Sequence, residues 1–317
     1  MENNLRVLVT GVGGQLGHDV MNELADRGLE GIGTDLAPSY AGVQDGSAVT
    51  QMPYVSLDIT DPEAVRDTIE NLRPDAVIHC AAWTAVDAAE EPENRDKVFL
   101  VNAQGTRFIA QACAQTGAKM LYLSTDYVFD GTGSAPWTPD CKDFSPLNVY
   151  GQSKLEGENA VRSLLERYFI VRIAWVFGLN GRNFIRTMLD VGKKHPQLRV
   201  VSDQIGTPTY TYDLARLLVD MILTDQYGCY HATNEGGFIS WYDFAVEIFR
   251  QAAAMGHPEY GTDRIQVTPV TTAEYGISKA ARPFNSRLDK SKLAAEGFTP
   301  LPDWRDALSR YLKEIGL

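Results

Sequence analysis

Positive charge is scarce in this sequence. Its 29 lysine and arginine residues stand against 41 aspartate and glutamate residues, which gives a net charge of −12 over 317 residues. Such an acidic chain is poorly suited to the phosphate backbone of nucleic acid, so we expect no general nucleic-acid binding. The overall charge says little about a small anionic ligand, because a few local arginines decide that question.

Long apolar runs and grouped cysteines are also missing. No apolar stretch is long enough to span a bilayer, and a strand-like segment begins at Leu5 with no signal peptide before it. Cys80, Cys113, Cys141 and Cys229 are spaced neither as disulfide partners nor as metal ligands. We therefore expect a cytoplasmic protein that uses no membrane anchor and no metal.

A glycine-rich turn follows the first strand-like segment. The apolar run over residues 5–9 stops at Gly11, and Gly14 and Gly17 follow at three-residue spacing before a periodic helix. Strand, glycine turn and helix in this order let backbone amides and the helix N-terminus approach a pyrophosphate. An ordinary tight turn is the alternative. The residues expected to contact a dinucleotide here are Gly11, Gly14, Gln15 and Leu16.

Two acidic strand ends come next. Asp35 ends the second strand-like segment, about 20 residues after the glycine turn, where a carboxylate accepts the ribose hydroxyls of NAD. The same carboxylate repels the extra phosphate of NADP, and no arginine or lysine among residues 28–50 offsets this. The sequence thus favours NADH, with NADPH left open. Asp58 and Ile59 end a further strand and are placed to meet the adenine.

Tyr150 and Lys154 stand four residues apart in a predicted helix over residues 150–167, so they share one helix face. A nearby cation favours the phenolate, which makes tyrosine a better proton donor to a ketone. Thr125 ends a strand about 25 residues earlier and is placed to hydrogen-bond the same carbonyl oxygen. Taken alone, the pair could be two surface residues of a helix. It gains weight from the glycine turn that precedes it.

The motifs run over nearly the whole chain. They are residues 10–17 (Thr-Gly-Val-Gly-Gly-Gln-Leu-Gly), 79–90 (His-Cys-Ala-Ala-Trp-Thr-Ala-Val-Asp-Ala-Ala-Glu), 101–106 (Val-Asn-Ala-Gln-Gly-Thr), 124–131 (Ser-Thr-Asp-Tyr-Val-Phe-Asp-Gly), 150–154, 172–178, 203–209 and 282–289. On these residues the sequence resembles the extended short-chain dehydrogenase/reductases and, within them, the dTDP-4-dehydrorhamnose reductases. The segments 124–131 and 203–209 are the most particular to that family.

Strand-like and helical segments alternate along the chain, with strands near 31–34, 75–80, 119–124 and 168–174. This rhythm predicts a parallel sheet with right-handed crossovers. With the resemblance, it implies an α/β protein: a Rossmann-type doubly wound parallel sheet with a smaller C-terminal α/β lobe that binds substrate. The expected domains are residues 1–178 plus about 208–235 for NAD(P), and residues 179–207 plus 236–317 for substrate.

The resemblance also implies roles for individual residues. Tyr150 would donate the proton, Thr125 would stabilise the developing alkoxide, and Lys154 would lower the pKa of Tyr150 and hold the nicotinamide ribose. Asn102 would stand near that lysine, with a helix-capping asparagine as the alternative. Further cofactor contacts are expected from Ala81, Ala82, Thr84, Asn102, Tyr150 and Lys154.

Substrate contacts are implied in the same way. Trp175 faces the deoxysugar in the resembling family, although a plain core tryptophan is the alternative. A nucleotide diphosphate needs cationic donors, for which Arg182, Arg282 and Arg287 are candidates, Arg287 with the best motif support. The expected substrate-binding residues are Val86, Asp87, Thr125, Asp126, Trp175 and Arg287.

One position separates this chain from relatives that eliminate water. Those dehydratases carry glutamate where Tyr127 follows Thr125 and Asp126, so the base that elimination needs is missing here. The sequence therefore predicts NAD(P)H-dependent reduction of the C4 ketone of dTDP-4-dehydro-6-deoxy-L-mannose to dTDP-L-rhamnose. A reductase of another NDP-4-keto-6-deoxysugar stays open. So does a non-catalytic regulatory protein like the methionine adenosyltransferase subunit. A homodimer is a family-level expectation only.

Overall fold

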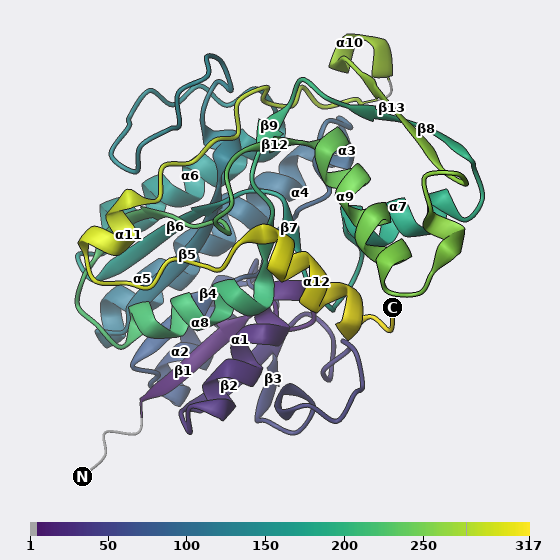
Figure 1. The fold of residues 1–317 in the computed structure, drawn as a ribbon. Helices are drawn as coiled ribbons and strands as arrows, with labels where there is room; N and C mark the ends of the chain where they lie inside the picture. The colour runs from purple at the N-terminus through teal and green to yellow at the C-terminus, as the bar shows by residue number, and fades with distance from the viewer. Residues whose placement is uncertain (1–4, 277) are drawn as a thin grey trace.

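A seven-stranded sheet forms the centre of the computed structural model, which describes residues 5–276 and 278–317 (Figure 1). Every strand pairs in parallel with its neighbours, in the order β11-β6-β5-β4-β1-β2-β3. The strands are β1 (Arg6–Thr10), β2 (Glu30–Asp35), β3 (Tyr54–Ser56), β4 (Ala76–His79), β5 (Lys119–Thr125), β6 (Tyr168–Ile173) and β11 (Gly228–His231). The predicted Rossmann-type parallel sheet is confirmed.

Helices cover both faces of the sheet, which explains why its strands are apolar on both sides. Val7 and Val9 of β1 pack with residues of α1 (Gln15–Asp26) and α8 (Thr211–Ile222). Leu8 points the other way, into a core shared with α2, α5 and α6. In Figure 1, α1 and α8 lie in front of the sheet. The helices of the other face are α2 (Pro62–Leu72), α5 (Thr106–Thr116) and α6 (Val149–Leu164).

The segment 208–235 lies with the sheet although it follows a long excursion of the chain. Strand β11 pairs with β6 at the sheet edge, and α8 packs beside α1. The division of the chain into a nucleotide domain and a substrate lobe stays a prediction.

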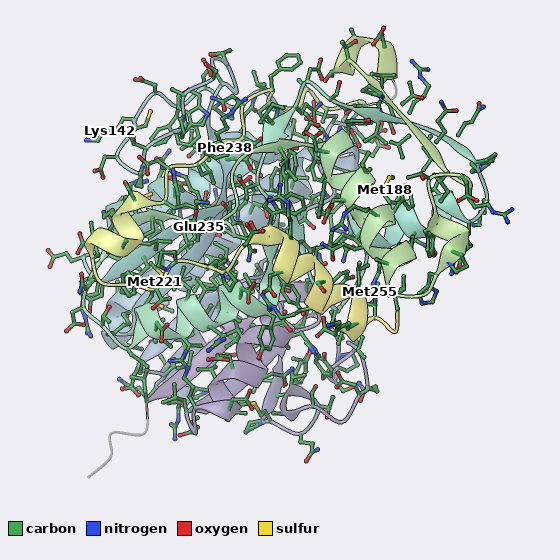
Figure 2. The ribbon with its side chains drawn as sticks, viewed as in Figure 1. Lys142, Met188, Met221, Glu235, Phe238 and Met255 are labelled. Carbon is green, nitrogen blue, oxygen red and sulfur yellow. The ribbon has the colours of Figure 1, made fainter. Side chains whose placement is uncertain are left out.

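A second apolar core lies beside the sheet. Phe177, Phe244 and Trp304 are buried in it. Met188 and Met255, both labelled in Figure 2, are partly buried and pack against it. Its main elements are α7 (Phe184–Gly192), α9 (Trp241–Ala254), α12 (Trp304–Glu314) and the parallel strand pair β8 (Gln197–Val201) and β13 (Gln266–Val270). Two-residue strand pairs join it to the rest: β7 (Val176–Phe177) with β10 (Thr209–Tyr210), and β9 (Ile205–Gly206) with β12 (Ile239–Ser240).

The remaining helical segments are short. They are α3 (Val86–Ala89), α4 (Arg95–Phe99), the π-helical segment η2 (Leu100–Gly105), α10 (Thr272–Tyr275), α11 (Ser291–Ala295) and the 3₁₀ turns η1 (Ala48–Thr50), η3 (Asp126–Val128) and η4 (Pro258–Tyr260). Among the described residues, no helix combines the length and the apolar character needed to cross a membrane.

The glycine turn brings helix α1 into close contact with the end of β1. Gly11 has a φ of 72°, and a Cβ there would lie 2.6 Å from the amide nitrogen of Ala81. A Cβ on Gly17 would lie 2.3 Å from the carbonyl oxygen of Gly11. Since neither backbone can move without disturbing the sheet, only glycine fits at both positions.

Gly17→Ala is expected to destabilise the protein by about 1–3 kcal/mol, because the new methyl group collides with a backbone oxygen. Gly14→Ala is the matched control, since its Cβ would lie 3.2 Å from the same oxygen of Gly11. The control should lose less stability than Gly17→Ala, because its contact is longer by 0.9 Å and leaves only the cost of alanine at the N-cap. Urea unfolding of the three proteins measures this, and equal loss in the two variants would contradict the packing argument.

Candidate active site

The predicted site residues gather at one edge of the sheet. Because the strands are parallel, the carboxyl ends of β1, β2, β4 and β5 all lie at this edge. Gly11, Asp35, Ala81 and Thr125 lie at or just after these strand ends, although they are as much as 114 residues apart in the sequence. The fold therefore places the cofactor and catalytic candidates on one side of the molecule.

The start of α1 is open to an anion. Gly14 is its N-cap, and among residues 5–276 and 278–317 no side chain bonds to the amides of the first turn. Such unpartnered amides at a helix N-terminus suit a diphosphate, and the close approach of Gly11 to Ala81 leaves no room for a side chain between them. The cradle fits a dinucleotide cofactor.

Two of the turn residues are engaged elsewhere through their side chains. The Gln15 carboxamide oxygen accepts from the Gly178 amide at 2.8 Å and from Asn183 Nδ2 at 3.0 Å. Leu16 is buried in the core under α1. Leu16 therefore has its backbone left for a cofactor, and Gln15 has its backbone and its side-chain Nε2.

Asp35 stands where the ribose prediction needs a carboxylate. Its Oδ2 accepts from the Gly13 amide at 2.8 Å and its Oδ1 from the Leu36 amide at 2.7 Å, which fixes the carboxylate at the sheet edge. Asp58 is exposed and accepts from the amide and hydroxyl of Thr60, and Ile59 is buried in the core. The cofactor roles of Asp58 and Ile59 stay predictions.

Asn102 stabilises the segment that follows β4 through hydrogen bonds to Trp83. Its Oδ1 accepts from the Trp83 amide at 2.8 Å, and its Nδ2 donates to the Trp83 carbonyl and to Ser153 Oγ. Because Asn102 lies inside η2 and caps no helix, the helix-capping alternative is wrong. The residue ties the segment of Ala81, Ala82 and Thr84 to the turn of α6 that carries Lys154.

Thr125 and Tyr150 meet where β5 ends against α6, and Lys154 lies one turn further along that helix. Thr125 is the last residue of β5, and Tyr150 and Lys154 lie in the first two turns of α6. Asn148 caps that helix by accepting from the Gly151 amide at 2.8 Å. A Cβ on Gly151 would lie 2.3 Å from the Tyr127 carbonyl oxygen, so glycine lets the helix approach η3 closely. The sequence predicted this meeting, and the packing explains it.

Burial sets the protonation of these groups. It raises the pKa of Tyr150, as does the charge of Asp126, while the hydrogen bond with Thr125 acts in the opposite direction. The phenol therefore stays protonated, which is the form that donates a proton. Burial lowers the pKa of Lys154 to about 7, against the negative charge of Glu158. The Lys154 ammonium lies over the ring of Tyr122 at 4.2 Å, and its effect on the pKa of Tyr150 stays a prediction.

Asp126 is almost fully enclosed beside the catalytic candidates. Burial raises its pKa to about 6, although the hydrogen bond with Thr125 acts in the opposite direction. Its Oδ1 accepts from Thr125 Oγ1 at 3.1 Å, and its Oδ2 has no hydrogen-bond partner among the described residues. A carboxyl oxygen left free in this place is available to a substrate hydroxyl.

Asp87 is held by the C-terminal part of the chain. Its two oxygens accept from the two terminal nitrogens of Arg282 at 3.0 and 2.7 Å, and Oδ1 also accepts from the Lys279 and Ala280 amides. These bonds lower the pKa of Asp87 to about 2, with the Arg282 hydrogen bond as the largest cause. Arg282 is thereby engaged with a carboxylate of the protein. Val86, the other predicted contact here, begins α3.

Trp175 and Arg287 lie at the junction of the two cores. Trp175 has a φ of 52°, a conformation that costs a non-glycine residue about 1–2 kcal/mol. It stacks on Trp241 at 3.7 Å and remains partly exposed, so it is not a plain core residue. Arg287 donates to Asn285 Oδ1 at 3.0 Å and lies over the Phe238 ring. Arg182 is exposed on the loop before α7.

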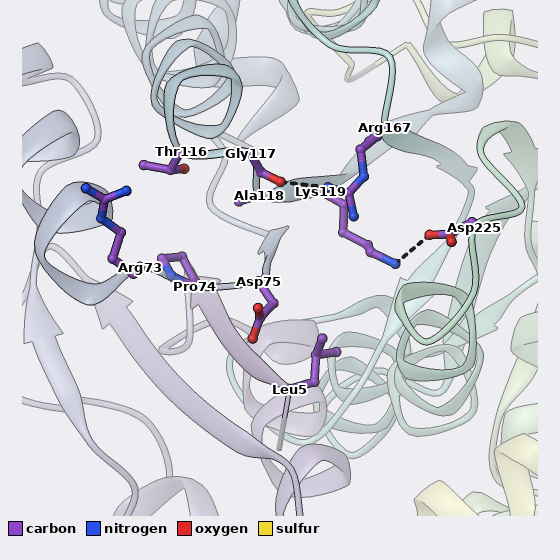
Figure 3. A pocket seen from close by; sticks show the side chains of 10 residues that line it. All are labelled: Leu5, Arg73, Pro74, Asp75, Thr116, Gly117, Ala118, Lys119, Arg167 and Asp225. Carbon is purple, nitrogen blue, oxygen red and sulfur yellow. Dashed lines mark hydrogen bonds and ion pairs between the residues drawn. The ribbon is translucent and has the colours of Figure 1, made fainter. Parts of the chain in front are cut away.

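A hollow of about 340 Å³ lies at the opposite, amino-terminal edge of the sheet (Figure 3). Two of its cations are already engaged: Lys119 Nζ donates to Asp225 at 3.0 Å and Arg167 donates to the Gly117 carbonyl at 2.9 Å. In parallel α/β sheets, ligands bind at the carboxyl ends of the strands. We assign no ligand to this hollow. Within residues 5–276 and 278–317, no three His, Cys, Asp or Glu side chains come together as metal ligands.

Comparison with known proteins gives consistent matches. A family model described as the RmlD substrate binding domain matches residues 5–317. The chain is 40% identical over 311 residues to the dTDP-4-dehydrorhamnose reductase of Streptomyces griseus, covering 96% of this chain and 92% of that protein. It is 37% identical over 309 residues to the spore coat polysaccharide biosynthesis protein SpsK of Bacillus subtilis, covering 98% and 97%.

A solved structure matches over a similar span. The crystal structure of dTDP-4-dehydrorhamnose reductase from Bacillus anthracis in complex with NADP has a TM-score of 0.84 to this chain at 37% identity. The match covers 98% of this chain and 99% of that chain.

Asp87→Asn is expected to destabilise the protein at neutral pH by about 1 kcal/mol, discounted because the Asp87 side chain is 45% exposed. Since the pKa of Asp87 is depressed, its ionised form stabilises the folded state above about pH 4. The difference from wild type should therefore vanish as the pH falls from about 4 to about 2. Urea unfolding at several pH values measures it, with Asp67→Asn on the exposed face of α2 as control. A difference that persists at the lowest pH would contradict the charge effect.

Proposed function

The chain belongs to the family described as the RmlD substrate binding domain, and from this membership we propose that it reduces the C4 ketone of dTDP-4-dehydro-6-deoxy-L-mannose to dTDP-L-rhamnose. The resemblance to dTDP-4-dehydrorhamnose reductases seen in the sequence is confirmed by these matches. The chain is accordingly an oxidoreductase of the class that uses a nicotinamide cofactor.

The proposal is supported by Thr125 at the end of β5 and by Tyr150 and Lys154 in the first turns of α6, at the sheet edge where α1 also begins. Thr125 comes from β5, Tyr150 and Lys154 from α6, and the glycine cradle from the start of α1. A glutamate that could remove a proton from the sugar is missing next to them, because Tyr127 takes that place. Carbonyl reduction needs only a hydride, a proton donor and a hydrogen bond to the developing alkoxide.

Each residue has a separate part in this chemistry. The bound nicotinamide supplies the hydride. Tyr150, kept protonated by burial, donates its phenolic proton to the carbonyl oxygen. Thr125 Oγ1 gives a second hydrogen bond to that oxygen, and Lys154 holds the ribose and supports the phenolate that Tyr150 becomes. Asp126 accepts from a sugar hydroxyl through its free Oδ2.

The diphosphate of the substrate requires a cation that the protein has not neutralised. Arg282 is engaged bidentately by Asp87, whereas Arg287 is bonded to the neutral side chain of Asn285. We therefore assign the diphosphate to Arg287, with Trp175 and Val86 facing the deoxysugar.

Asp35 favours NADH as the coenzyme. Its carboxylate is fixed at the end of β2, next to the glycine cradle, and repels a 2′-phosphate. No arginine or lysine lies in the segment 28–50 to offset that repulsion. The bound NADP in the Bacillus anthracis relative makes NADPH the coenzyme to test beside it.

The decisive assay follows NAD(P)H oxidation at 340 nm with enzymatically generated dTDP-4-dehydro-L-rhamnose. Rapid oxidation, with dTDP-L-rhamnose identified as product by NMR, would establish the reaction and its stereochemistry. Oxidation only with another NDP-4-keto-6-deoxysugar would keep the chemistry and replace the substrate. Coenzyme binding without oxidation of any such sugar would overturn the proposal.

Tyr150→Phe should lower kcat by about 10² or more, because the proton donor is lost while the ring keeps its place. NADH affinity, measured by fluorescence titration, should change little. Tyr212→Phe on the exposed side of α8 serves as control and should keep the wild-type rate. A wild-type kcat in Tyr150→Phe would remove Tyr150 from the mechanism.

Asp35→Ala should weaken NADH binding more than NADPH binding, because it removes both the ribose acceptor and the repulsion of the 2′-phosphate. The ratio of the two dissociation constants is the quantity to measure. Asp67→Ala, which removes an exposed carboxylate of α2, should leave the ratio unchanged. An unchanged ratio in Asp35→Ala would mean that this carboxylate does not contact the coenzyme ribose.

A further inference from the structure

Two tryptophans stack on each other where the two apolar cores meet. Trp175 follows β6, and Trp241 is the first residue of α9. Their ring centroids lie 3.7 Å apart, and their planes differ by 15°. At this distance each ring limits how far the other can turn.

Trp175 lies on the side of the sheet that carries the candidate active site. Ile173, two residues before it, is the register partner of Thr125 in the pairing of β5 with β6. Trp175 also packs against the cluster that contains Val128 and Phe129, which follow Thr125 closely in the chain. Since Trp175 remains partly exposed, part of its surface is open to a ligand in this place.

The backbone of Trp175 is held in an unfavourable conformation. Its φ of 52° lies in the left-handed region, which bulky residues rarely adopt. The Trp175 carbonyl accepts from the Thr209 amide at 3.0 Å, and the preceding Ala174 carbonyl accepts from the Thr209 hydroxyl at 2.6 Å. Strained residues persist where surrounding contacts hold them, and they gather at ligand sites. The strain therefore indicates that the orientation of this tryptophan has a use in the protein.

The ladder of β9 with β12 brings two contacts to the Trp175 ring. In this ladder Gly206 pairs with Ile239, which lies two residues before Trp241. A Cβ on Gly206 would lie 2.9 Å from Cε2 of Trp175, so a side chain at this position would displace the ring. One short ladder thus supplies both the closely approaching backbone and the stacking ring.

Trp241 is itself anchored in the second core. Its ring lies 4.6 Å from that of Phe184, the first residue of α7, and 6.4 Å from that of Phe244 within α9. Phe244 is buried, and Trp241 is partly buried against the same core. The second core therefore fixes Trp241, and Trp241 in turn limits the orientation of Trp175.

We propose that Trp241 is a positioning residue that holds the Trp175 indole in the orientation in which it packs against the deoxysugar ring of the substrate. The inference rests on the proposed function, which places Trp175 at the deoxysugar. Trp241 takes no part in the proton or hydride transfer, and it acts on the substrate only through Trp175.

The test measures kcat and KM for the keto sugar, and the affinities for dTDP-L-rhamnose and for dTDP by calorimetry. In Trp241→Ala, KM should rise about tenfold while kcat stays within about threefold of wild type. The affinity for dTDP-L-rhamnose should fall about tenfold and that for dTDP should not change, because Trp175 contacts only the sugar. Trp241→Phe keeps a ring for stacking and should restore the wild-type values within about threefold.

A double-mutant cycle determines whether Trp241 acts through Trp175. Trp175→Ala should lose at least as much affinity for dTDP-L-rhamnose as Trp241→Ala, and the double variant should bind no more weakly than Trp175→Ala. Tyr242→Ala is the matched control, because it removes the next aromatic side chain of α9 from the same core. Adjacent helix residues face different directions, so this control should keep the wild-type KM.

Three results would overturn the inference. Equal loss of affinity for dTDP-L-rhamnose and dTDP would indicate a general disturbance of the site. A lower Tm with unchanged KM would indicate a structural role alone. Additive losses in the double variant would mean that Trp241 acts independently of Trp175. If Trp241→Ala does not fold, Trp241→Leu takes its place with the same expectations, since it keeps an apolar side chain without a planar ring.

Failure of the proposed function has a different signature. If wild type oxidises NADH with no NDP-4-keto-6-deoxysugar, the reductase proposal fails, and the calorimetric comparison still tests the inference. If Trp175→Ala binds dTDP-L-rhamnose and dTDP as wild type does, Trp175 does not contact the sugar and the inference is overturned, whatever the rates.

Discussion

The ion pair of Glu158 and Arg172 is the constraint on which the geometry of the site depends. Removing two charges from water costs several kcal/mol for each ion, and only complete hydrogen bonding offsets this. The chain supplies it from three elements, since Glu158 comes from α6, Ser124 from β5 and Arg172 from β6. Any slip of α6 along the sheet would leave a buried charge without a partner. Because Thr125 follows Ser124 on β5 and Lys154 lies one turn before Glu158 on α6, this arrangement also fixes the positions of Thr125 and Lys154.

The same enclosure determines which groups of the site carry charge. Desolvation keeps Tyr150 protonated at neutral pH, and it raises the pKa of Asp126 to about 6, so that Asp126 takes up a proton in mildly acidic solution. Lys154 is affected in the opposite sense, because burial disfavours its charged form. A single desolvated site thus favours the proton donor and penalises the cation that assists it.

Local sequence patterns were enough to predict most of the central sheet. Contacts between segments far apart in the sequence could not be predicted in this way. Short stretches of sequence are enough to recognise an apolar strand, the spacing of Gly11 and Gly17, and the alternation of strands with helices. For this reason β1, β5 and α6 were predictable. The pairing of β8 with β13 was not, because its two strands are polar at several positions and lie about 65 residues apart. Asn102 was open to misinterpretation for the same reason, since its partner Ser153 is 51 residues away.

The arginines of the substrate site illustrate what side-chain contacts add to a motif. Arg282 and Arg287 belong to one motif, residues 282–289, and the sequence offers both as diphosphate ligands. In the structure, Asp87 neutralises Arg282, and the pair joins the segment after β4 to the C-terminal part of the chain. A neutralised guanidinium attracts an anion weakly, whereas Arg287 keeps its charge beside neutral Asn285. Arg282 therefore stabilises the structure around the site, and Arg287 remains available to bind the ligand.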